Sequence, residues 1–409
     1  MSRDHYLKNN IVVGYSRLMG EDKAGTLARI KLLRSEVFDR KVEEYGEHFR
    51  GCKLLNECIG LKPIRVDIRT YQQLAKPQGE HMKKISIPFA SLAVFTFIAA
   101  TTASAAELKI LTSWNKNIWP TYVVLDTFVK NIAKIGGDKI KVRISGPEVV
   151  PGFQQLQPVK AGVFDILFTH GVYHMGSKGL AAIADAMNAD PVGKRTSGVW
   201  DHLDNFYQNT HGLKLLAISP NSTKGYHIFL KKPIEGGNWK GRKIRGTQTY
   251  HGVIKLFGGQ PVVMPGSQVY SALEKGVVDG AAWPAAGMLS MKHFEVAKYK
   301  VRPTFGTSTL PILMNMKSFN KLTKEERNIL LQAGKLTELE MPWIGDKMQA
   351  EEDAELAKLG VKVTRIPADK IAEMRKAFSD SLWTLGEKCC GAAAKKMRAL
   401  AVKAGLSPE

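Results

Sequence analysis

Leu108-Lys109-Ile110-Leu111-Thr112 is a short apolar run, and together with the segments that follow it decides the fold class. An amphipathic helical pattern follows it, and then a second apolar run, a short helical pattern and a third apolar run. Strand candidates that alternate with helical crossovers predict an open α/β sheet. The four later segments span 121–134, 139–144, 154–161 and 164–168.

The same alternation continues downstream and indicates a second sheet. Thr323 and Glu326 form a capping box that opens a long helical pattern, which runs to residue 357 and is broken only by Pro342. We therefore expect two α/β lobes joined by more than one crossing. The remaining elements are helices at 196–207, 253–257 and 269–275, and strands at 213–218, 226–230, 243–245 and 361–365.

An export signal begins inside the chain at Met82. Lys83 and Lys84 precede an uncharged apolar stretch over 85–100, and Ala103-Ser104-Ala105 supplies the small residues that signal peptidase needs. A transmembrane helix is the alternative, but the stretch is shorter than the roughly 20 residues required to cross a bilayer, and Pro88 interrupts it. We predict a signal peptide over 82–105, cleavage after Ala105 and a periplasmic mature protein.

Residues 1–81 carry a different pattern, Val12-Val13-Gly14-Tyr15 followed by an amphipathic helix. This stretch resembles the opening of a class III nucleotidyl cyclase domain. That family has a metal-binding aspartate where this chain has Ile11, and the similarity stops near Arg50, before a second such aspartate. A fragment without both carboxylates cannot hold two Mg²⁺ ions. We interpret it as a gene remnant or as upstream sequence joined by a misplaced start, in either case outside the mature protein.

The net charge of +21 over 409 residues belongs mainly to the mature part. Residues 106–409 hold 42 Lys+Arg and 27 Asp+Glu, a net charge of +15. Because acids are interspersed and no arginine-rich arm occurs, this predicts a general attraction for anions and no nucleic-acid partner. Adjacent cysteines rarely form an unstrained bridge, so we expect Cys389 and Cys390 to be reduced or paired between chains.

Ligands of open α/β sheets bind at the carboxyl ends of the strands, so the side chains that follow each strand are the candidates for a binding site. Aromatic and polar residues are concentrated at these positions. In the first lobe they are Trp114, Asn115, Glu148, Phe153, Thr169, His170 and Tyr173, and in the second they are Arg245, Tyr250 and Trp283.

Three motifs follow one another behind the signal peptide: Gly146-Pro147-Glu148-Val149-Val150-Pro151, Lys240-Gly241-Arg242-Lys243-Ile244-Arg245, and Gly276-Val277-Val278-Asp279-Gly280. With these motifs in this order, the chain resembles the solute-binding proteins of TRAP transporters. The resemblance implies a two-lobed periplasmic clamshell, with two mixed sheets flanked by helices and a long helix spanning the lobes. It also implies capture of an organic anion for a membrane permease. We place the first lobe at 106–230 plus a return segment at 308–345, and the second at 231–307 plus the C-terminal helices.

The resemblance assigns the ligand carboxylate to Arg245. A planar guanidinium can grip a carboxylate through two parallel charge-assisted hydrogen bonds, which lysine cannot match. Two departures from the family bear on the ligand. His227 stands where many members have a second arginine, and Ala282 stands where a keto-acid subgroup has a metal-binding glutamate. One arginine among aromatic walls favours a monocarboxylate with an apolar or aromatic body, without metal or cofactor.

Competing functions have weaker support. His170 and His174 could share a helix face as metal ligands, but no third ligand lies nearby in the sequence, so we expect loop histidines. No Gly-x-Ser-x-Gly elbow, Walker loop or Cys-x-x-Cys pair occurs, which disfavours an enzyme. A solute-binding protein of another transporter class, or a periplasmic ligand sensor, remains an alternative.

Overall fold

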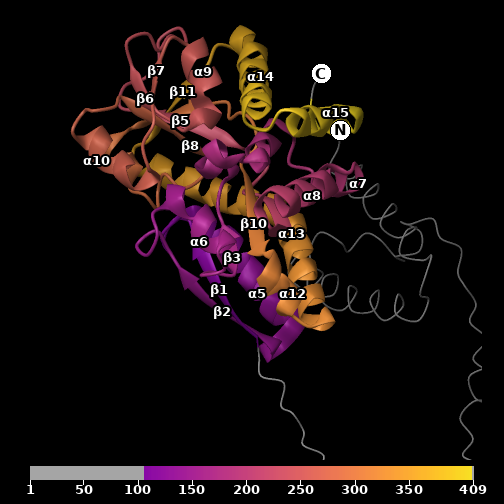
Figure 1. Cartoon of the computed structure of the whole chain (residues 1–409). Helices are drawn as coiled ribbons and strands as arrows, with labels where there is room; N and C mark the ends of the chain where they lie inside the picture. Colours follow the sequence, from indigo (N-terminus) through magenta and orange to yellow (C-terminus); the bar gives the residue numbers. More distant parts are fainter. Residues whose placement is uncertain (1–105, 408–409) are drawn as a thin grey trace, which may run out of the picture. The chain divides into compact units, whose positions relative to one another are not determined.

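The structure is a computed structural model that describes residues 106–407 (Figure 1). The expectations for the cyclase-like stretch and for the signal peptide therefore lie outside the described residues. Over 106–407, no helix combines the length and apolar character needed to cross a membrane. The described chain forms two mixed sheets flanked by helices, as the sequence predicts.

The first sheet has the strand order β2-β1-β3-β10-β4. Its first three strands are parallel, with Ile110 of β1 opposite both Ile144 and Ile166. β10 enters antiparallel between β3 and β4, which completes the sheet with a strand from far along the chain. The strands span Ala106–Thr112 (β1), Ile140–Ser145 (β2), Ile166–Phe168 (β3), Leu213–Pro220 (β4) and Thr309–Asn315 (β10).

Helices cover this sheet because each presents one apolar face to it. α5 buries Phe128 and Ile132, and α8 buries Leu203 and Tyr207 before Gly212 ends it in the left-handed conformation (φ 67°) that glycine adopts without strain. The helices of this lobe are η3 (Pro120–Leu125), α5 (Asp126–Gly136), η4 (Gly137–Lys139), η5 (Gly152–Gln154), α6 (Leu156–Lys160), η6 (Gly171–Ser177), η7 (Leu180–Ala186), α7 (Pro191–Thr196), α8 (Val199–His211) and α12 (Met316–Lys321).

The second sheet has the order β11-β9-β5-β8-β6-β7. β5 is antiparallel to β8 and β9, whereas β6 is parallel to both β7 and β8. Its strands are β5 (Tyr226–Leu230), β6 (Lys243–Arg245), β7 (Gln260–Val262), β8 (Gly280–Pro284), β9 (Tyr299–Arg302) and β11 (Lys362–Arg365), and its helices are η8 (Gln248–Tyr250), α9 (His251–Leu256), η9 (Gly266–Gln268), α10 (Val269–Glu274) and α11 (His293–Val296).

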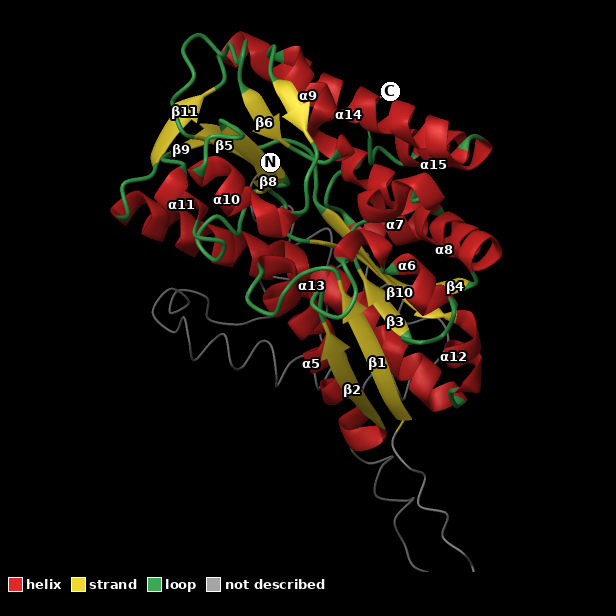
Figure 2. Ribbon diagram, turned by 60° about the vertical axis from the view of Figure 1, so that its left-hand side comes forward, coloured by secondary structure: helices red, strands yellow, loops and turns green. Residues whose placement is uncertain are grey.

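α13 (Lys324–Lys358) is the long helix that spans the lobes (Figure 2). The capping box of Thr323 and Glu326 is present, as predicted. Near its middle Glu338 accepts the Ile218 amide of β4 at 2.6 Å, and near its end Glu352 accepts the amides of Gly287 and Met288 in the second lobe. The prediction that Pro342 breaks the helix was wrong. The helix continues through the proline because its two halves are held by separate lobes, which offsets the lost hydrogen bond.

The C-terminal helices are η10 (Ala368–Lys370), α14 (Ile371–Cys390) and α15 (Ala392–Lys403). α14 packs against α9 of the second lobe and also against η7 of the first, and α15 packs on α8 (Figure 1). These helices are therefore not confined to the second lobe, where the sequence analysis placed them. Phe378 of α14 contacts both Tyr226 and Phe305, so one apolar core continues across the junction of the lobes.

Cys389 and Cys390 are joined by a disulfide within the chain, contrary to the expectation that they are reduced or paired between chains. Both side chains leave the last turn of α14, where Gly391 ends the helix with a positive φ.

Candidate functional site

A cleft of about 880 Å³ separates the two lobes and is large enough for a small organic ligand. Its first-lobe wall comes from the segment after β1, the loop between β2 and α6, and Tyr173. Its second-lobe wall comes from η9, α10, Trp283 and the segment after β8. We call it the outer cleft. Among its lining residues are Asn115, Phe153, Gln268, Lys292 and Glu295.

A smaller recess of about 40 Å³ shares Trp114, Tyr173 and Trp283 with the outer cleft. Of the described residues that line it, none carries a carboxyl group, and Arg245 is the sole lysine or arginine. The other lining residues are Pro120, His170, Val172, Asn221, Tyr226, Thr247, Tyr250, Pro284, Ser308 and Leu310.

Arg245 is the last residue of β6 and is only 1% exposed. Its Nε and Nη2 donate to the Met264 carbonyl at 3.1 and 2.9 Å, and its Nη1 donates to the Ala282 carbonyl at 3.2 Å. These contacts use three of the five guanidinium hydrogens, so one hydrogen on each terminal nitrogen is left without a partner among residues 106–407. Burial lowers the pKa of Arg245, yet arginine stays protonated in proteins. The site therefore holds a fixed positive charge with two donors to spare.

Aromatic rings from both lobes surround this charge. The guanidinium carbon of Arg245 lies 5.2 Å from the Trp283 ring centroid. On the other lobe the Trp114 and Tyr173 centroids are 5.5 Å apart, and Trp114 Nε1 donates to Tyr173 Oη at 3.2 Å. Trp283 was expected to follow a strand, but it lies within β8, from which it lines both the outer cleft and the recess.

His170 lines the recess with its polar atoms already engaged. Its Nδ1 accepts the Val172 amide at 3.2 Å, and its Nε2 lies 2.8 Å from Asp185 Oδ2. Tyr226 Oη also donates to Asp185 Oδ2, at 2.5 Å, and the Thr309 amide donates to Oδ1 at 2.8 Å. Asp185 is fully buried and thus ties η7 to β5 and β10, the strands that flank the crossings between the lobes.

Sequence reasoning missed both Asp185 and Tyr226 as site residues. A single acid inside the apolar run Leu180–Ala186 was an available signal, because a buried carboxylate requires several donors. Tyr226 was passed over in favour of its neighbour His227.

Other predicted residues lie elsewhere. Glu148 is exposed and accepts the amide of Gly146 at 2.7 Å. Thr169 is buried and accepts the Ser113 hydroxyl at 2.7 Å. Neither lines the outer cleft or the recess. The structure brings together Arg245, Tyr250, Trp283, Trp114, Tyr173 and His170 at the recess, with Asn115 and Phe153 on the wall of the outer cleft.

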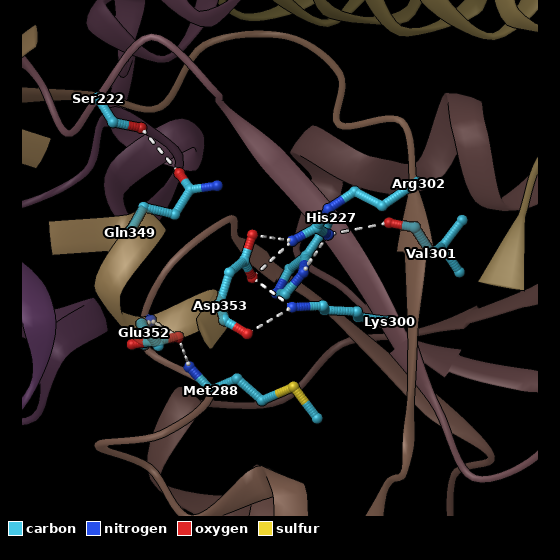
Figure 3. Close-up of polar contacts among 10 residues, drawn as sticks. Ser222, His227, Met288, Lys300, Val301, Arg302, Gln349, Glu352 and Asp353 are labelled. Atoms are coloured by element: carbon cyan, nitrogen blue, oxygen red, sulfur yellow. Dashed lines mark hydrogen bonds and ion pairs between the residues drawn. The ribbon is translucent and has the colours of Figure 1, made fainter. Parts of the chain in front are cut away.

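His227 lines neither the outer cleft nor the recess, although it lies directly opposite Trp283 across β5 and β8 and so shares a face of the sheet with it. Figure 3 shows it beside Arg302, whose Nη1 lies 3.0 Å from His227 Nδ1. Burial, and then the charges of Arg302 and Lys300, lower the pKa of His227 well below its usual value. Both cations pair with Asp353 of α13, at 2.9 and 2.6 Å, so this cluster anchors the long helix to the second lobe.

His293 predicts a specific pH dependence of stability. The ring is fully buried and stacks on Phe229 at 4.7 Å, and neither nitrogen has a partner among the described residues. Burial, and then the charge of Arg245, lower its pKa to about 3. Between this value and the unfolded pKa near 6.5 the unfolded chain binds the extra proton, so this group removes stability as the pH falls.

The variant His293→Phe should keep the shape of the ring and lose this dependence. Between pH 6.5 and 4.5 we expect its free energy of unfolding, measured in urea, to fall by about 2 kcal/mol less than that of the wild type. Phe294→Leu, which changes an apolar side chain of the same helix α11 and no titratable group, is the control and should follow the wild type. Parallel pH profiles for His293→Phe and the wild type would contradict the assignment.

A metal centre has no support in the described part of the chain. No group of three or more His, Cys, Asp or Glu side chains there is arranged to hold an ion. His174 Nε2 lies 2.9 Å from Tyr207 Oη, and His170 is held by Asp185, so the two histidines serve separate contacts. Ala282 contributes only its carbonyl oxygen, which Arg245 occupies.

The chain belongs to family 7 of the bacterial extracellular solute-binding proteins (DctP), whose profile matches residues 122–386. A relative is the monocarboxylate 2-oxoacid-binding periplasmic protein of Nostoc sp., which is 26% identical over 241 residues. This match covers 55% of the chain and 64% of that relative, so the chain spans somewhat less than two thirds of the relative's length.

Solved structures share the fold. A TRAP periplasmic solute-binding protein from Desulfovibrio salexigens with bound orotic acid superposes with a TM-score of 0.63 at 20% identity, covering 73% of this chain and 98% of that one. A TRAP transporter solute-binding protein from Bordetella bronchiseptica, with calcium and picolinate in one active site, gives a TM-score of 0.62 at 20% identity, covering 74% and 93%.

Proposed function

We propose that this protein is the extracytoplasmic solute-binding component of a TRAP-type transporter, and that it captures an organic monocarboxylate for import. The observation that carries the proposal is the recess, where one buried arginine with two unused donors is accompanied by no carboxyl group. Such a site complements a single carboxylate. The family supports the transport role, and the ligand would be released unchanged to a membrane permease.

The walls of the site support an apolar or aromatic ligand body. Trp114 and Tyr173 face the cleft from the first lobe and Trp283 from the second, so a flat ligand would be held between rings from both lobes. Orotic acid and picolinate, which occupy two proteins of the same fold, are aromatic monocarboxylates. A ligand that touches both lobes binds the closed form more tightly and so drives closure.

The test uses protein expressed from Met82 in a Gram-negative host and recovered from the periplasm. We expect its N-terminal sequence to begin at Ala106.

In a thermal-shift screen with added chelator, monocarboxylates with apolar or aromatic bodies should raise the melting temperature, because a bound ligand stabilises the folded protein by RT ln(1+[L]/Kd). If only neutral sugars or cations shift the transition, the proposal is wrong. Binding that vanishes with chelator would contradict the metal-free site.

A further inference from the structure

Two tyrosine hydroxyls flank Arg245, one from each lobe. Tyr173 lies in η6 of the first lobe, and its oxygen accepts from Trp114 Nε1, so its own proton is unused. Tyr250 ends η8 of the second lobe, and its hydroxyl has no hydrogen-bond partner within residues 106–407. Burial raises the pKa of both phenols, so both keep their protons at neutral pH. The recess therefore presents two hydroxyl donors in addition to the guanidinium.

The carboxylate of Asp185, close to the recess, already has its hydrogen-bond partners. Asp185 lies behind His170 and Tyr226, is fully buried and accepts from three donors. The remaining polar groups of the recess are neutral: the hydroxyls of Thr247 and Ser308 and the amide of Asn221. Asn221 Nδ2 donates to Ser308 Oγ at 2.6 Å, and its Oδ1 is a buried acceptor without a partner. A neutral amide oxygen cannot compensate a buried positive charge.

Building on the proposed function, we propose that the recess selects acids by the substituent next to the carboxylate. It favours a hydrogen-bond acceptor there, as in 2-oxo acids or aromatic acids with a ring nitrogen beside the carboxylate. It rejects 2-amino acids. The carboxylate pairs with Arg245, and a neighbouring acceptor oxygen or nitrogen receives a tyrosine proton. An ammonium group at that position would lose its hydration without gaining a carboxylate partner. It would also lie beside the positive charge of Arg245.

The first test is titration calorimetry with three ligands of matched shape: phenylpyruvate, 3-phenylpropanoate and L-phenylalanine. We expect phenylpyruvate to bind most tightly and L-phenylalanine at least about 10-fold more weakly than phenylpyruvate. Binding of L-phenylalanine as tight as that of phenylpyruvate would overturn the selectivity and leave the carboxylate function standing. If none of these ligands binds, and no other monocarboxylate does, the proposed function fails as well.

The second test locates the selectivity. Tyr173→Phe and Tyr250→Phe each remove one hydroxyl and keep the ring, and we expect at least one to lower the preference for phenylpyruvate over 3-phenylpropanoate by about 10-fold. Tyr299→Phe is the control, because Tyr299 lies in β9 and lines neither the outer cleft nor the recess. A preference ratio that stays constant in both recess variants, or that changes equally in the control, would overturn the proposal.

Discussion

Replacing Arg245 with alanine should weaken binding of the best monocarboxylate by about two orders of magnitude or more. Removal of one partner from a buried, hydrogen-bonded charge pair costs about 2 to 5 kcal/mol. Arg245→Lys keeps the charge but loses the two-pronged geometry, and Arg245→Met keeps most of the volume, so both should also bind poorly. Titration calorimetry of the three variants measures the effect.

The matched control is Arg242→Ala, three residues earlier in the chain, where the guanidinium donates only to the Lys232 and Pro233 carbonyls. Its affinity should stay close to that of the wild type. Circular dichroism and the melting temperature of each variant establish that it is folded, since loss of Arg245 leaves the Met264 and Ala282 carbonyls without their donor. Near wild-type affinity in a folded Arg245→Ala protein would remove this residue from the site.

Replacing Asp185 with alanine should destabilise the protein by about 3 kcal/mol or more, because a buried carboxylate disappears and its donors lose their acceptor. These donors are the Thr309 amide, the Tyr226 hydroxyl and His170 Nε2. For a chain of this size we expect the melting temperature to fall by roughly 5 to 10 °C. Thermal unfolding without ligand gives the value.

Asp201→Ala is the control for this change, because Asp201 is exposed on α8. It should shift the melting temperature by less than about 1 °C. Asp185→Asn should fall between the two, since an amide oxygen can still accept from Thr309 while its NH₂ group faces two donors. An Asp185→Ala protein that melts with the wild type would show that this carboxylate does not hold the crossings together.

Local patterns predicted β1 to β6 and β11, but not β7 to β10. β1 and β5 follow from short apolar runs, and α13 follows from its capping box. β10 was not predicted as a strand, and Pro311 inside it argues against a central strand in a sequence taken alone. The strand forms because β3 and β4 pair with β10 on its two sides, and these pairings cannot be seen in the local sequence.

The site was less predictable than the fold. Arg245 was accessible from its motif and its place at a strand end, and the aromatic residues from their places near strand ends. His227 and Tyr226 are neighbours on one strand and face opposite sides of the sheet; Tyr226 lines the recess, whereas His227 contacts Arg302. The apolar run around Asp185 marks it as a buried acid, but its donors lie 41 and 124 positions away in the sequence, so its role shows only in the structure. Tertiary contacts, and not local propensity, position these groups.

The place of β10 in the first sheet has a consequence for how the protein can be made. This strand is synthesised after β5 to β9 of the second sheet, yet it holds β3 and β4 together. A nascent chain shorter than Asn315 therefore cannot complete its first lobe, and a high contact order of this kind slows folding. Cutting the gene between β9 and β10 would separate β10 from the sheet that it completes, so we expect residues 106–407 to fold as one unit.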